Sequence, residues 1–267
     1  MRERLGRMPR HRTRQSQGSR QDKVSRQDRG SRRRAVTWRP GWDTAVAAVT
    51  LLVFWGCYWA GTTLSEWFLA VGVVIVGTLI PAIVVFRRGE GWAGLGVRRR
   101  FWVVALIVSA VLGIGSVPYL LQLTQVHGTA ATPHLLANLL VLWEPLFVFG
   151  WLFGRWERAF GWLPAIVLTA AGFALQHVGS VPLTAALGFG GFAIVYAVAF
   201  AAVRNLLILW PLFYPVGSAI GTLQAGHPMG WPDVLWGTGL IAVQALTLGM
   251  IRRWPARPRE QTARGTC

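Results

Sequence analysis

The strongest constraint on this chain is a series of long apolar runs that continues from residue 44 to residue 251. A helix needs roughly 20 apolar residues to cross about 30 Å of hydrocarbon, and each run approaches that length. The runs lie near 44–62, 67–86, 101–122, 135–154, 160–177, 183–203, 205–224 and 233–251. They lack the alternation of apolar and polar residues that membrane β-strands require. The sequence therefore predicts an all-α, polytopic membrane helix bundle of about eight transmembrane helices.

The composition agrees with a membrane setting. Hydrophobic residues make up 53% of the 267 residues and charged residues only 14%. A soluble domain of this size would lack the polar surface that keeps such a protein dispersed. We therefore expect membrane lipid to be the main partner of the chain. The two cysteines, Cys57 and Cys267, are far apart in sequence and give no sign of a disulfide framework or a metal site.

The positive charge of the chain is confined to segments between the apolar runs. The formal net charge is +17, and fourteen of the 27 Lys and Arg residues lie between Arg2 and Arg39. If the chain crosses eight times from a cytoplasmic N-terminus, every Lys and Arg falls on the cytoplasmic side. The opposite loops, near 63–66, 123–134, 178–182 and 225–232, then contain none. This distribution follows the positive-inside rule and predicts a multi-pass protein of the inner or plasma (cell) membrane, with both termini cytoplasmic.

Composition also divides the chain into three parts. Residues 1–40 are rich in Arg, Gln, Ser and Gly and cannot bury a core, so we expect a disordered basic cytoplasmic tail there. About forty polar residues precede the first apolar run, which does not fit a cleavable signal peptide. The transmembrane bundle is expected over 41–252 and a second cytoplasmic tail over 253–267. The first tail should be attracted to anionic lipid, and because no aromatic residue precedes Trp38 we expect no nucleic-acid partner.

One acidic residue lies deep within an apolar run. Glu144 sits in the middle of LVLWEPLFVFGWLFG, where an ionised carboxylate is costly without a partner or a water-filled cavity. The group is therefore either neutral or held in a polar pocket, and both states suit acid–base catalysis. Pro145 follows directly and disturbs the helix, and irregular helix at this depth usually lines a cavity. The alternative is a protonated Glu144 that hydrogen-bonds a neighbouring helix.

The second candidate is His177, which closes the run AIVLTAAGFALQH and is the one histidine inside an apolar run. Imidazole can accept or donate a proton near neutral pH. A rise of about 1.5 Å per residue places His177 roughly 8 Å nearer the outer face than Glu144, a gap that tilt and proline irregularities could partly close. The alternative is an interfacial residue that faces the outer headgroups. The other histidines are assigned to solvent: His11, His127, His134 and His227.

Three blocks of the sequence resemble the motifs of the CAAX-protease-and-bacteriocin-processing (CPBP) family of intramembrane peptidases. The first family block has two adjacent glutamates, followed three residues later by Arg and Gly. Here it reads EPLFVFGWLFGRW. Glu144 matches the first glutamate and Gly150 the glycine, whereas Pro145 and Phe149 replace the second glutamate and the arginine.

The second family block, Phe and His separated by three residues, is matched fully by Phe173 and His177 in FALQH. The third, a His followed four positions later by Asn or Asp, aligns with WPLFYPVGSA, where Pro215 and Ala219 occupy the two positions. The basic stretches GRWERAFGWLPAI and GWAGLGVRRRFW add weaker likeness. The resemblance covers roughly residues 90–220.

The resemblance implies a catalytic pair. In the family, the first glutamate and the second-block histidine activate a water for attack on a peptide carbonyl, so Glu144 would be the general base and His177 its partner. No cofactor or metal is implied. The third-block polar pair stabilises the oxyanion, and no residue here matches it. Loss of oxyanion donors commonly lowers the rate by about two or three orders of magnitude, so slow or absent proteolysis is expected. Three residues could supply a substitute donor: Asn205, Tyr214 and Ser218.

These observations predict an intramembrane endopeptidase that hydrolyses a peptide or membrane-protein substrate near the bilayer surface. The alternative is a catalytically inactive protein of the same fold that acts as a membrane scaffold or immunity protein. A third reading, a transporter with Glu144 as proton relay, lacks detectable inverted repeats. A zinc centre is disfavoured, because one histidine and one carboxylate are fewer than the three protein ligands usual for catalytic zinc.

Overall fold

The computed structural model describes residues 34–252, so residues 1–33 of the predicted tail over 1–40 and the whole predicted tail over 253–267 lie outside the described residues. The helices are α2 (Trp42–Thr63), α3 (Glu66–Val71), η1 (Gly72–Leu79), α4 (Ile80–Arg87), η2 (Gly91–Leu95), α5 (Trp102–Val126), α6 (Ala131–Leu139), α7 (Trp143–Pro145), η3 (Leu146–Leu152), α8 (Phe153–Phe160), α9 (Trp162–His177), α10 (Leu183–Val203), η4 (Leu206–Ile208), α11 (Phe213–Gln224) and α12 (Trp231–Arg252). Between residues 34 and 252 there is no β-strand, and the all-α prediction is confirmed.

Six helical stretches in the described part of the chain are long and apolar enough to cross a membrane, as a multi-pass membrane protein requires. They are Trp42–Thr63, Glu66–Arg87, Trp102–Val126, Ala131–Phe160, Leu183–Val203 and Trp231–Ile251. The predicted count of eight is not confirmed. The run at 160–177 forms the shorter helix α9, of 16 residues, and the run at 205–224 yields the 12-residue α11.

The run at 205–224 is not one helix because local signals interrupt it. Arg204 ends α10 in the left-handed conformation, with φ of 59°. Asn205 is extended, and its side-chain oxygen accepts a hydrogen bond from the N–H of Leu207, which starts the single turn η4. Pro211 has no N–H and disfavours a helical residue before it. Regular helix therefore resumes only at Phe213.

The span that carries Glu144 is broken in the way that Pro145 predicts. Residues 140–142 interrupt the helix after α6, α7 is a short turn, and η3 is a π-helix that leads into α8. Single π-helical turns often mark functional sites. This span is also the most enclosed of the six. In its most apolar 18-residue stretch 67% is buried, against at most 44% in the other spans.

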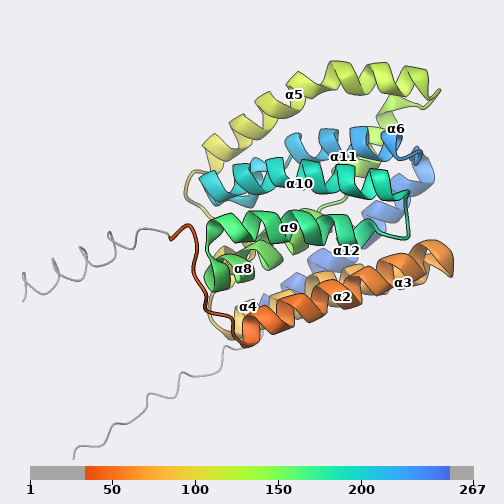
Figure 1. The fold of residues 1–267 in the computed structure, drawn as a ribbon. Helices are drawn as coiled ribbons and strands as arrows, with labels where there is room; N and C mark the ends of the chain where they lie inside the picture. Colours follow the sequence, from red (N-terminus) through yellow and green to blue (C-terminus); the bar gives the residue numbers. More distant parts are fainter. Residues whose placement is uncertain (1–33, 253–267) are drawn as a thin grey trace, which may run out of the picture. The chain divides into compact units, whose positions relative to one another are not determined.

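The neighbours of this central span are set by helix packing. Figure 1 shows α9 between α2 and α10, with α5 against α11 on the other side of α10. The core includes the aromatic residues of η3 and α8, and Phe147, Phe149, Trp151 and Phe153 are completely buried. Helices α9 and α11 thus both reach Glu144.

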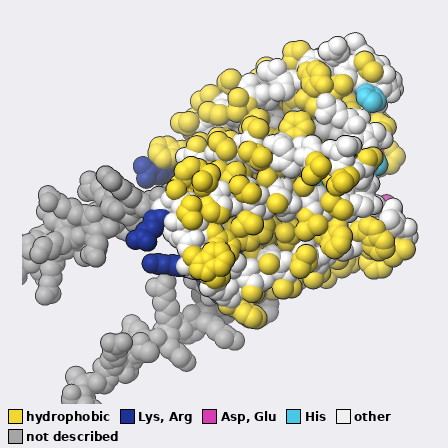
Figure 2. All heavy atoms as spheres, viewed as in Figure 1, with side chains coloured by type: hydrophobic (Ala, Val, Ile, Leu, Met, Phe, Trp, Pro, Cys, Tyr) yellow, Lys and Arg dark blue, Asp and Glu magenta, His cyan; other side chains and the backbone are white. Residues whose placement is uncertain are grey.

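Charged and apolar side chains separate along the helices. Figure 2 shows apolar atoms along the sides of the bundle and the visible Lys and Arg side chains at one end. The backbone that precedes α2 lies against this end, since the N–H of Thr37 donates to the carbonyl of Phe160 at 2.8 Å and that of Arg39 to Ala159 at 2.7 Å. Residues 37–39, which belong to the predicted tail, are therefore in contact with α8.

Candidate active site

Glu144 is 5% exposed and is held from two other helices. The amide nitrogen of Gln176, in α9, donates a hydrogen bond to Oε1 of Glu144, and the hydroxyl of Tyr214, in α11, donates to Oε2. Both partners are donors, which is the arrangement that suits an ionised carboxylate. The break around Pro145 places the carboxyl group at the point where α9 and α11 meet the central span.

His177, the last residue of α9, is 6% exposed, and its ring faces the carboxyl group of Glu144. Its Nδ1 lies 2.8 Å from the carbonyl oxygen of Phe173. A carbonyl only accepts, so Nδ1 carries the hydrogen and Nε2 of the neutral ring carries the lone pair. That Nε2 lies 3.6 Å from Oε1 of Glu144. The structure thus brings the two predicted residues together, and the alternative of a histidine facing the headgroups does not hold.

Aromatic side chains fix the orientation of the histidine ring. The ring centroid of His177 lies 5.1 Å from that of Tyr58, 5.0 Å from Phe173 and 4.6 Å from Phe189. These contacts come from α2, from the preceding turn of α9 and from α10. A ring packed on several sides keeps its Nε2 directed at the carboxyl group, which favours a preorganised pair.

Glu144 and His177 line a common cavity of about 200 Å³. Its wall is mostly apolar and includes several aromatic side chains, and the exposed Asp233 at the start of α12 also lines it, so the cavity reaches the surface there. The lining residues with hydrogen-bonding or titratable side chains include Tyr58, Asn138, Glu144, His177, Tyr196, Tyr214 and Ser218. A cavity with apolar walls and a few convergent polar groups is the usual form of a ligand site.

One histidine that the sequence assigned to solvent is buried, and that assignment is wrong. His134 is 0% exposed, and its Nδ1 accepts a hydrogen bond from the N–H of Met229 at 2.9 Å. Nε2 therefore carries the hydrogen and donates to the carbonyl of Ala219, also at 2.9 Å. Helix α6 begins at Ala131, earlier than the apolar run indicates, and turns this residue toward α11. His134 thus links α6 to α11 and to the loop before α12.

The three predicted substitute donors have different surroundings. Tyr214 is bound to Glu144, and the hydroxyl of Ser218 donates to Oδ1 of Asn138 at 2.7 Å. Asn205 does not line the cavity, and its amide donates to the carbonyls of Arg98 and Arg100 at 2.7 and 3.2 Å. Their hydrogens are already used within the protein.

Two site residues were missed by the sequence reading. Gln176 is completely buried beside His177, and a polar residue within an apolar run is a signal that could have identified it. Tyr196, in α10, is 3% exposed and lines the cavity. Among residues 34–252 its hydroxyl has no hydrogen-bond partner. No sequence signal distinguished Tyr196 from the other aromatic residues of its run.

Within the described range, no group of three or more His, Cys, Asp or Glu side chains could hold a metal ion. No family model, curated protein or solved structure matches the chain.

Proposed function

We propose that this chain is an intramembrane endopeptidase of the CPBP type that cleaves peptides by a glutamate-activated water. The observation that carries the proposal is the 3.6 Å separation between Oε1 of Glu144 and Nε2 of His177 within a common cavity. This distance is too long for a direct hydrogen bond, and polar groups so spaced are commonly bridged by water. Two acceptors side by side can take both hydrogens of one water molecule and leave its oxygen lone pair directed outward.

The reaction follows from these roles. The water oxygen attacks the carbonyl carbon of the substrate peptide while Oε1 of Glu144 takes one proton. His177 Nε2 accepts the other hydrogen as a hydrogen bond and orients the attack. The tetrahedral intermediate then loses its C–N bond, and the carboxyl group of Glu144 returns the proton to the leaving amine nitrogen. Water is consumed, and a carboxylic acid and an amine are released.

Gln176 and Tyr214 act on the general base and not on the substrate. Each donates to one oxygen of Glu144 and so stabilises the ionised form in a site with little water. Because these donors come from α9 and α11, they also fix the plane of the carboxylate. A base fixed in position avoids the reorganisation that would otherwise raise the barrier.

Tyr196 supplies the oxyanion donor in this mechanism. Its hydroxyl lines the cavity and has no partner among the described residues, so its hydrogen is available to the negative oxygen of the intermediate. Tyr214 and Ser218, by contrast, donate within the protein. One fixed donor in a dry site contributes about 10²–10³ in rate.

The proposal includes the placement of the chain in the cell membrane. The arginine-rich end of the bundle is cytoplasmic, as are both termini, in keeping with the positive-inside rule. The shorter helix α9 and the segment that contains α11 bring the number of crossings to eight. Substrate enters from the opposite end, where the cavity reaches Asp233, so the substrate is an apolar peptide or membrane-protein segment in extended form.

The test is cleavage of membrane-proximal reporter peptides in cells that lack the native protein. Glu144→Gln and His177→Ala should each reduce cleavage at least about 100-fold, as loss of a general base or its partner does. Glu66→Gln, which changes an exposed acid outside the cavity, is the matched control and should leave cleavage unchanged. Wild-type cleavage in both cavity variants would overturn the proposal.

A membrane scaffold or immunity protein is the second candidate, and one observation favours it. Both oxygens of Glu144 already accept hydrogen bonds within the protein, as in a carboxylate that links helices. This candidate predicts that an apolar peptide carrying a photocrosslinker labels the cavity equally in wild type and Glu144→Gln, with no cleaved product from either. The peptidase predicts product from the wild type alone.

A further inference from the structure

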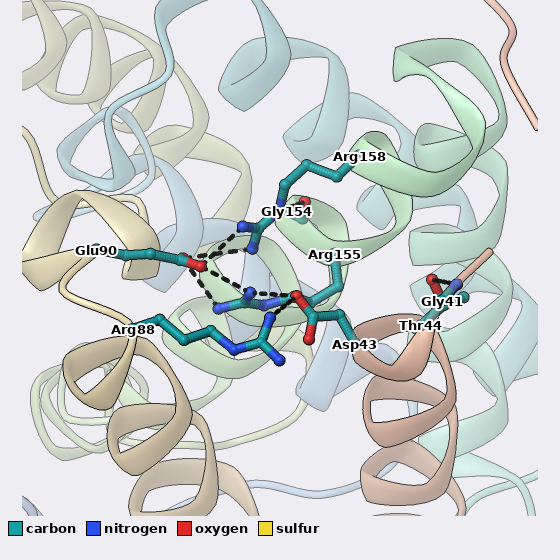
Figure 3. A network of polar contacts seen from close by, with 8 residues as sticks. All are labelled: Gly41, Asp43, Thr44, Arg88, Glu90, Gly154, Arg155 and Arg158. Atoms are coloured by element: carbon teal, nitrogen blue, oxygen red, sulfur yellow. Dashed lines mark hydrogen bonds and ion pairs between the residues drawn. The ribbon is translucent and has the colours of Figure 1, made fainter. Parts of the chain in front are cut away.

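A network of ion pairs closes the arginine-rich end of the bundle. Figure 3 shows the guanidinium group of Arg155 between the carboxylates of Asp43 and Glu90. Its Nη1 and Nη2 donate to the two oxygens of Glu90, both at 3.1 Å, and the Arg155 side chain is 0% exposed. Arg88 also pairs with Asp43, and Arg158 with Glu90 at 2.8 Å. Three arginines thus share two carboxylates, and the network carries excess positive charge.

A surface hollow of about 290 Å³ lies beside this network. Arg98, Arg158 and Arg204 line it, together with Glu90 and Glu157. Both carboxylates are already engaged, because Glu157 receives the bidentate pair from Arg204 and Glu90 the pairs from Arg155 and Arg158. The local field in the hollow is therefore positive, and its arginine forks are the groups that bind phosphate oxygens best in proteins.

Glycine keeps the hollow open. Gly154 lines it, and a Cβ at this position would meet no atom within 4 Å. Gly154 lies one helical turn before Arg158, and its carbonyl accepts from Nε of Arg158 at 3.2 Å, which holds that side chain over the hollow. A side chain introduced at residue 154 can therefore fill the space without displacing the protein around it.

The surroundings of the hollow point to a lipid. Phe200 and Arg204 line it from the end of α10. Figure 2 shows apolar side chains over much of the visible face of the bundle, beside the arginine-rich end. A headgroup bound in the hollow therefore lies at the charged end of a bundle whose visible side is apolar, where acyl chains can pack.

We propose that this hollow binds the phosphate of an anionic phospholipid headgroup, with Arg158 and Arg98 contacting the phosphate oxygens. The site does not depend on the peptidase proposal, because it lies at the arginine-rich end and shares no lining residue with the cavity of Glu144. Bound lipid would bridge η2, α8 and α10 and so stabilise the packing of three segments.

The test uses the purified full chain in a mild detergent, titrated with phosphatidylglycerol or phosphatidylcholine and followed by native mass spectrometry and thermal unfolding. Phosphatidylglycerol should bind and raise the unfolding temperature, and phosphatidylcholine should not. Gly154→Glu should weaken phosphatidylglycerol binding at least tenfold relative to Gly154→Gln, which fills the same space without charge. Equal binding by these two variants would overturn the site.

Two further comparisons distinguish a lipid site in the hollow from general charge attraction and from a site for a soluble phosphate. Arg158→Gln should weaken binding, whereas Arg99→Gln, which removes the same charge from an exposed residue outside the hollow, should not. Equal losses would mean general charge attraction and would overturn the proposal. Free glycerol 3-phosphate should not reproduce the stabilisation, and an equal effect from it would assign the hollow to a soluble phosphate instead of a lipid.

Discussion

The hydroxyl oxygen of Tyr196 lies where a side chain of residue 217 would begin, since a Cβ built on Gly217 would be 1.8 Å from it. The ring cannot turn aside, because its centroid lies 5.0 Å from Phe213, 5.2 Å from Tyr214 and 6.0 Å from Phe149. Glycine at residue 217 is thus what allows the tyrosine to extend its hydroxyl into the cavity wall.

The first prediction is that Gly217→Ala and Tyr196→Phe have the same kinetic effect. Each should lower kcat for peptide cleavage about 10²–10³-fold, because each removes the proposed oxyanion donor from its position, and KM should change little. The double variant should be no slower than either single variant. Gly191→Ala, at an open position of α10, is the control. An unchanged kcat in Tyr196→Phe would remove the oxyanion role and leave that of Glu144 untouched.

The second prediction compares two tyrosines by stability. Tyr214→Phe removes a donor from the buried carboxylate of Glu144 and should lower the free energy of unfolding by about 1–3 kcal/mol. Tyr196→Phe should lower it far less, because its hydroxyl has no partner among the described residues. Unfolding of both variants in mixed micelles measures the difference. Equal losses would show that the two hydroxyls are equivalent, contrary to their assigned roles.

The polar surroundings of Glu144 in the candidate site could be predicted because the relevant signals are local. A carboxylate within an apolar run must be near polar partners, and a proline after it must disturb the helix. Both expectations apply to Glu144 and Pro145, which stand at the break in the central span. The partners themselves could not be predicted, because Gln176 and Tyr214 reach Glu144 through the packing of separate helices.

The interrupted helix at 205–224 and the buried His134 were missed because individual hydrogen bonds and packing contacts decide them. An apolar run of sufficient length predicts a helix, but the side chain of Asn205 and the missing N–H of Pro211 act on the backbone and interrupt it. His134 lies close to a predicted loop, and only the contacts of α6 with α11 and Met229 bury it. The mean hydropathy of a run does not reveal such individual hydrogen bonds.

The third prediction concerns Asn205, which the sequence offered as a possible oxyanion donor. Because its amide donates to the carbonyls of Arg98 and Arg100, Asn205→Ala should lower the free energy of unfolding by about 1–3 kcal/mol. The kcat of the remaining folded protein should be unchanged. Asn205→Asp keeps the acceptor for Leu207 but loses both donations, so it should be nearly as unstable. A stable Asn205→Ala with reduced kcat would place this residue in the reaction after all.

The fourth prediction follows from the charges around Glu90. Burial by itself would raise the pKa of this carboxyl, but hydrogen bonds and charge from Arg158 and Arg155 outweigh burial and hold the pKa below its ordinary value of 4.5. The folded state therefore favours the ionised form more than the unfolded state does. The stabilisation from Glu90 is complete above the ordinary pKa and is lost as the pH falls through the lower pKa of the folded state.

Thermal unfolding of wild type and Glu90→Gln across the acid range measures this effect. At neutral pH the variant should unfold at a lower temperature, because Arg155 loses the carboxylate that receives both of its terminal nitrogens. The difference should shrink as the pH falls below 4.5, where Glu90 of the unfolded chain binds a proton, and should be lost below the lower pKa of the folded state. The exposed Glu66, changed to Gln, should give no such pH-dependent difference. A gap between wild type and Glu90→Gln that stays constant down to strongly acidic pH would mean that the ion pairs of Glu90 in Figure 3 contribute nothing to stability.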